Sequence, residues 1–134
     1  MQISAEPIGS QYTTKEESDI TELSLSPSGL RIIVTTCPLG SLERIWIEYL
    51  FINPRGFRFL DEGDLLRYWQ SKIFINGYHL FKIQSGGWRD QEIQLSGMLS
   101  VTSTIEIFNE WFVCTSNRSL NVISVSPPFI REIK

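Results

Sequence analysis

The sequence predicts an α+β fold: a mainly antiparallel sheet of six to seven strands with one firm helix packed on it. The first observation is a series of short runs in which apolar and polar residues alternate, joined by turn-forming segments. The second is that only Asp61–Lys72 carries a clear apolar stripe at helical spacing. Because short connections favour antiparallel neighbours, we expect a meander of hairpins in a single domain over residues 1–134.

The run IWIEYLFI, at 45–52, is apolar on both faces of its predicted strand. Such a strand is typical of the centre of a sheet, flanked by other strands and covered by a helix, so we expect Trp46 in the core. The segment Asn53–Gly56 favours a type I turn. We expect this turn to fold Phe57 and Phe59 back along the same ribbon.

The remaining strands follow from the same alternation. One hairpin is predicted from 19–26 and 30–37, a strand at 78–84, and a second hairpin from 105–115 and 120–126. In the strand at 105–115, Trp111 and Val113 share one side, and Phe112 and Cys114 share the other. Residues 1–18 are polar and are expected to be an irregular, frayed or edge segment. Two prolines at 127 and 128 should stop the sheet, so that 129–134 pack over one end. The pattern of Trp88–Leu99 leaves a short helix and a short strand open, with the helix favoured.

The acidic residues at the start of the predicted helix are explained by capping. The Asp61 carboxylate can accept hydrogen bonds from the unpaired backbone N–H groups at the helix start. Glu62 and Asp64 add negative charge to the first turn. Their close spacing also suggests a cation site, but the other oxygen ligands of a calcium loop are missing. We therefore predict no metal site and no cofactor.

Composition bounds the partners and the location. The net charge is −3 and the sequence pI is about 5.2, which disfavours nucleic acid and anionic membranes and is compatible with a basic protein partner. No secretory signal or membrane-spanning run is seen, so the cytoplasm is expected. Cys37 and Cys114 have no metal or redox spacing and are predicted to be free buried thiols.

The only histidine limits the catalytic schemes. Every triad or dyad would need His79, which shares a predicted strand face with Phe81 and Ile83, as a core histidine would. The segment Arg55–Phe59 resembles the aromatic strand of RNA-recognition domains. The large residue Arg58, the lack of a preceding helix and the acidic chain count against RNA binding.

Partner contacts are predicted at one tryptophan. Trp88 follows two glycines and precedes Arg89, so we expect it to be half exposed, and Trp beside Arg is typical of binding hot spots. A helix-start anchor packing on the sheet is the favoured role of Trp88, and an exposed binding residue is the alternative. Trp46, Trp69 and Trp111 are expected inside. The predicted partner-binding residues are Trp88, Arg89, Asp61, Glu62 and Asp64.

The runs GFRFLDEGDLLRYW, SGGWRDQE and EWFVCTSNRSLNVISVSPP resemble small uncharacterised bacterial proteins, some of which are taken to be immunity proteins of toxin systems. The resemblance covers about Leu30 to the C-terminus and consists of element order and aromatic placement. It implies an α+β binding protein without catalysis and transfers no site residue. Because the sequence shows no convergent catalytic set and only one histidine, we predict a non-enzymatic, immunity-like protein-interaction domain that binds a protein partner. The alternative is a small enzyme or small-molecule binder with a pocket between helix and sheet near His79.

Overall fold

The computed structural model describes residues 3–12, 18–38, 43–60, 74, 77–94 and 108–133. These residues form nine strands and one short helix. The strands are β1 (Ser4–Pro7), β2 (Asp19–Ser26), β3 (Gly29–Thr36), β4 (Ile45–Phe51), β5 (Gly56–Leu60), β6 (Leu80–Ser85), β7 (Asn109–Cys114), β8 (Ser119–Ser124) and β9 (Phe129–Ile133), and the helix is α2 (Trp88–Gln94). Among the described residues, no helix is long and apolar enough to cross a membrane.

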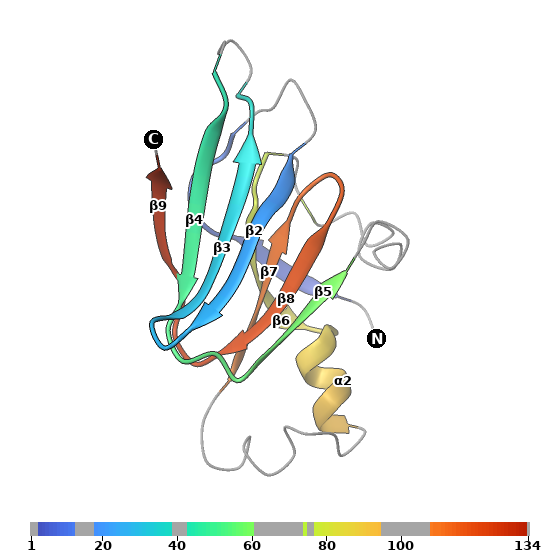
Figure 1. Ribbon diagram of the computed structural model, residues 1–134. Helices are drawn as coiled ribbons and strands as arrows, with labels where there is room; N and C mark the ends of the chain where they lie inside the picture. The colour runs from blue at the N-terminus through green and yellow to red at the C-terminus, as the bar shows by residue number, and fades with distance from the viewer. Residues whose placement is uncertain are drawn as a thin grey trace.

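The strands build two antiparallel sheets that face each other as a sandwich (Figure 1). One sheet has the order β1-β6-β7-β8-β5 and the other the order β2-β3-β4-β9, while α2 lies outside the sandwich beside the five-stranded sheet. The prediction of mainly antiparallel structure is confirmed. The prediction of one sheet with six to seven strands is wrong, because nine strands divide between two sheets. The helix predicted at Asp61–Lys72 falls outside the described residues.

The core between the sheets is made by alternate residues that point inward from both layers. Its buried members are Ile20, Leu30, Ile32, Val34, Ile47, Tyr49, Phe51, Leu80, Trp111, Val113, Leu120 and Val122. Fully burying an aliphatic or aromatic side chain of this kind contributes about 1.5–3 kcal/mol. This shared core fixes the two sheets against each other.

The five-stranded sheet is buried on its other face too. Strand β7 shows this directly, because Trp111 and Val113 point into the core while Phe112 and Cys114 join a second apolar cluster on the opposite face. The sequence predicted this division of β7. Cys37 and Cys114 are free and buried, as predicted.

The predicted hairpin between β4 and β5 is wrong. Strand β5 pairs with β8 in the other sheet, and the backbone N–H of Arg55 donates to the carbonyl of Ile123 at 2.8 Å. The chain does turn at Asn53, which has a positive φ of 57°. Both edges of β4 are occupied, by β3 and by β9, so β5 crosses to the opposite layer.

The prediction for 129–134 is also wrong, since Phe129–Ile133 forms β9 and pairs with β4. The two prolines mark the point where the chain changes sheets. Two other hairpins are confirmed, β2 with β3 and β7 with β8, as is the central place of β4. In the amino-terminal segment, Ser4–Pro7 is an edge strand on β6.

Candidate functional site

The candidate site is the side of the four-stranded sheet that points away from the other sheet, which we call the outer face. Strand pairing arranges its residues in three rows across β2, β3, β4 and β9. Along the strands, the rows are Thr21, Thr35, Trp46 and Ile133; then Glu22, Ile33, Glu48 and Arg131; then Ser24, Arg31, Leu50 and Phe129.

Four charged side chains of alternating sign cross the whole outer face, and we call them the charge ladder: Glu22, Arg31, Glu48 and Arg131. Arg31 pairs through Nη1 with Glu22 at 2.7 Å and donates through Nε to Glu48 Oε2 at 2.5 Å. Arg131 donates through Nε to Glu48 Oε1 at 2.8 Å. Each of the four strands thus contributes one rung.

The central carboxylate of the ladder is buried by its own partners. Glu48 is 6% exposed although it lies on an outer face. Hydrogen bonds from Arg131 and Arg31 hold the pKa of Glu48 below its usual value, and the bond to Glu48 raises the pKa of Arg31. The charges of Glu48 and Arg31 therefore persist at neutral pH, and hydrogen bonds to Glu48 hold both arginines.

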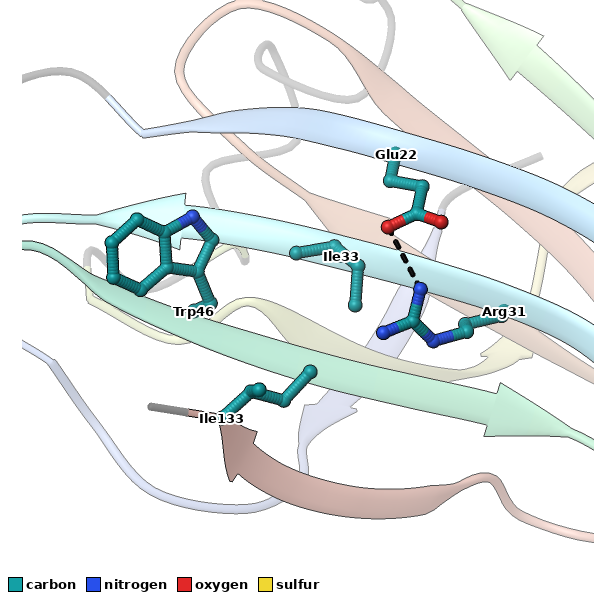
Figure 2. A pocket seen from close by; sticks show the side chains of 5 residues that line it. All are labelled: Glu22, Arg31, Ile33, Trp46 and Ile133. Carbon is teal, nitrogen blue, oxygen red and sulfur yellow. Dashed lines mark ion pairs between the residues drawn. The ribbon is translucent and has the colours of Figure 1, made fainter.

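A shallow open pocket of about 280 Å³ lies on the outer face, and its lining residues are Glu22, Arg31, Ile33, Trp46 and Ile133. Figure 2 shows the Trp46 indole at one end, the Arg31–Glu22 pair at the other and Ile33 between them. Ile33 is 4% exposed and Trp46 is 42% exposed. An apolar floor beside an exposed Trp and a charged rim is the composition of a protein-binding hot spot.

The prediction that Trp46 lies in the core is wrong. Its cross-strand neighbours on the outer face are Thr35 and Ile133, and these leave much of the indole in solvent. The sequence carried one signal for this, because Arg44 and Glu48 share the predicted face of Trp46.

Trp88 was expected to be half exposed, but it is 9% exposed at the start of α2. It packs with Phe108 and Ile123, and the Arg58 guanidinium lies 5.2 Å from its ring centroid. This placement is the helix-start anchor that the sequence favours. Arg89 follows it on α2 and pairs with Asp90 at 3.3 Å.

The acidic residues Asp61, Glu62 and Asp64 lie outside the described residues, so the structure does not place them relative to Trp88. The partner-binding role of these three residues, and of Trp88 and Arg89, stays a prediction.

Sequence reasoning missed a buried polar chain beneath α2. Glu110 is 1% exposed; its Oε1 accepts from the Arg89 backbone N–H at 2.7 Å, and its Oε2 accepts from Asn121 Nδ2 at 2.7 Å. Asn121 Oδ1 in turn accepts from Arg58. Burial raises the pKa of Glu110, against the hydrogen bonds that lower it. A lone carboxylate among the apolar residues of one strand face was the available signal.

His79 and Cys114 do not form a reactive pair. Burial lowers the pKa of His79 to about 4 and raises the pKa of Cys114 to about 12. Both groups are therefore neutral at pH 7, whereas a nucleophilic cysteine needs a thiolate beside a basic group. The described residues also hold no group of three or more His, Cys, Asp or Glu side chains that could bind a metal ion.

Comparison with protein-family models, with curated proteins and with solved structures finds no match for this chain.

Proposed function

We propose that this chain is a non-enzymatic protein-interaction domain that binds its partner on the outer face. The observation that carries the proposal is Trp46, 42% exposed on a central strand, in one pocket with an arginine that is held by two carboxylates. Truncating a Trp or Arg anchor of this kind commonly costs at least about 2 kcal/mol of binding free energy.

Preorganisation of the outer face supports this role. Arg31 is fixed by Glu22 and Glu48, and Trp46 lies on a strand with neighbours on both sides. Side chains that are already ordered lose little conformational freedom on binding, so more of the contact energy becomes affinity. The exposed charges at the two edges of the sheet would add to the association rate.

A role in toxin immunity, which the resemblance implies, would make the partner a toxin domain in the cytoplasm. The net charge of −3 is compatible with a basic toxin as that partner. The alternative of a small enzyme near His79 gains no support from the neutral states of His79 and Cys114.

The test is a quantitative pull-down from the source cell extract with three forms of the tagged chain: wild type, Trp46→Ala and Phe57→Ala. Phe57 is the matched control, because it is a similarly exposed aromatic residue on a strand of the other sheet. Wild type and Phe57→Ala should recover one stoichiometric partner, and Trp46→Ala should recover at least about 30-fold less at limiting concentration.

Circular dichroism must show that all three forms are folded. Equal recovery by Trp46→Ala and Phe57→Ala would show that the outer face is not the binding surface. Recovery of no partner by folded wild type, together with a monomeric state at about 1 mM, would contradict the proposed function itself.

A further inference from the structure

We propose that the partner on the outer face is a second copy of this chain, bound face to face in a two-fold symmetric dimer. The inference rests on the proposed function, since it takes the outer face as the binding surface. What it adds is the identity of the partner, and the arrangement of charge on the face is the reason for it.

The outer face is self-complementary in charge. Glu22 lies on the edge strand β2 and Arg131 on the opposite edge strand β9, in the same row of the sheet. A two-fold axis parallel to the strands, between β3 and β4, places β2 of one copy over β9 of the other. Glu22 then faces Arg131 of the second copy, and by symmetry the contact occurs twice.

The two residues that would meet are the exposed ends of the charge ladder. The side chains of Glu22 and Arg131 are 49% and 69% exposed, while Glu48 between them is buried. The ladder's internal ion pairs can therefore persist while the new pairs form. The same axis places Arg31 over Leu50 of the second copy, because Arg31 and Leu50 are cross-strand partners.

The apolar residues of the outer face are covered in the same arrangement. Trp46 comes to lie over Thr35 of the second copy and beside its symmetry mate near the axis, because Thr35 and Trp46 are cross-strand partners. Phe129, exposed at the β9 edge, comes to lie over Ser24. Face-to-face sheets pack about 10 Å apart, which leaves room for these side chains.

The size of the face sets the strength of the dimer. Four strands of about seven residues make a face of roughly 19 Å by 23 Å, or about 440 Å² per copy. A stable interface buries about 800 Å² per partner. We therefore infer a weak dimer that forms in a concentration-dependent way, with a dissociation constant in the micromolar range or above.

Charge reversal tests the pairing of the two edges. Sedimentation equilibrium is measured from about 1 µM to about 1 mM, the range in which a weak dimer dissociates, for wild type, Glu22→Arg, Arg131→Glu and an equimolar mixture of the two variants. Each variant alone opposes like charges at both edges and should dimerise at least about tenfold more weakly. The mixture opposes unlike charges at both edges and should recover the dimer as a heterodimer.

Glu132→Arg is the matched control, since Glu132 is exposed on the same edge strand but points to the other face of the sheet. It should dimerise as wild type does. Trp46→Ser should weaken the dimer without any change of charge. Circular dichroism and thermal melting confirm that each variant is folded before its mass is measured.

A wild type that is monomeric at about 1 mM, or a mixture that stays monomeric while wild type dimerises, overturns the proposal. If Glu22→Arg leaves dimerisation unchanged and Glu132→Arg weakens it, the two copies meet at the β9 edge, and the face-to-face arrangement is wrong. The proposed function is tested separately. If wild type is monomeric but binds a different partner, and Trp46→Ala weakens that binding, the proposed function stands and only the dimer is ruled out.

Discussion

Asn121→Ala should show what the buried chain beneath α2 contributes to stability. Asn121 is fully buried and donates from Nδ2 to Glu110 while its Oδ1 accepts from Arg58. The substitution removes one of the two hydrogen bonds to the Glu110 carboxylate. Arg58 is partly exposed and can turn to water, so the cost falls mainly on Glu110.

The magnitude follows from the burial of the acceptor. A buried polar group left without its hydrogen bond costs about 1–3 kcal/mol, and the loss of buried volume adds to it, so we expect Asn121→Ala to lower the free energy of unfolding by about 2–4 kcal/mol. For a domain of this size that is a fall in Tm of roughly 8–15 °C. Urea unfolding followed by tryptophan fluorescence measures it.

The effect should also depend on pH with a definite sign. The folded-state pKa of Glu110 lies above its usual value of 4.5, so the stability linked to its protonation is present below about pH 4.5 and is lost as the pH rises through the raised pKa. Without the Asn121 donor the folded pKa rises further. Asn121→Ala should therefore be more destabilising at pH 8 than at pH 5.

Asn109→Ala is the matched control, because the Asn109 side chain donates to the Val125 carbonyl at an exposed position. We expect a change within about 0.5 kcal/mol at both pH values. The reasoning is refuted if the two variants lose the same stability, or if the loss in Asn121→Ala is the same at pH 5 and pH 8.

Other predictions concern single sites. Gly87→Ala should cost about 1–3 kcal/mol in a thermal melt, since an added Cβ would lie 2.5 Å from Glu110 Oε1; an unchanged Tm would contradict the close approach. Trp88→Ala should cost about 3–5 kcal/mol in urea unfolding, as a buried anchor does, and a loss below about 1 kcal/mol would argue against that role. His79→Gln should flatten the stability profile between pH 6.5 and 4, because the folded pKa of about 4 makes wild type lose stability as the pH falls through that window; an unchanged slope would exclude His79 as its source. Asp61→Ala should cost about 1 kcal/mol if Asp61 caps the sequence-predicted helix, and an unchanged denaturation midpoint would place the cap elsewhere.

The sequence pattern correctly predicted strand pairing where the partner strands follow each other along the chain. The β7–β8 hairpin and the division of β7 into a Trp111 side and a Phe112 side follow from alternation and a nearby turn. The same holds for β2 and β3, which are joined by Pro27 and Ser28. In each case the partner strand is the next one along the chain, so no choice between distant partners arises.

The partners of β5 and β9 could not be predicted in this way. The turn-forming residues after β4 predict that the chain bends at Asn53. They do not determine which sheet the next strand joins. That choice depends on whether the edges of β4 are free. One of them is taken by β9, which follows much later in the sequence, so the local pattern around β4 does not contain the answer.

The outer face was misassigned for a related reason, and this bears on its function. A strand that is apolar on both faces indicates burial on both sides, yet on β4 the covering of the outer side comes from the long side chains of Arg31 and Arg131 over Glu48. The residues of the ladder come from four segments that only the strand register brings together. Folding explains why Ile33 and Glu48 are sheltered, but it gives no reason for a tryptophan at position 46 to face solvent. A large aromatic residue that the core does not use, on the same face as arginines already held in place, is the feature that binding to another protein surface would explain.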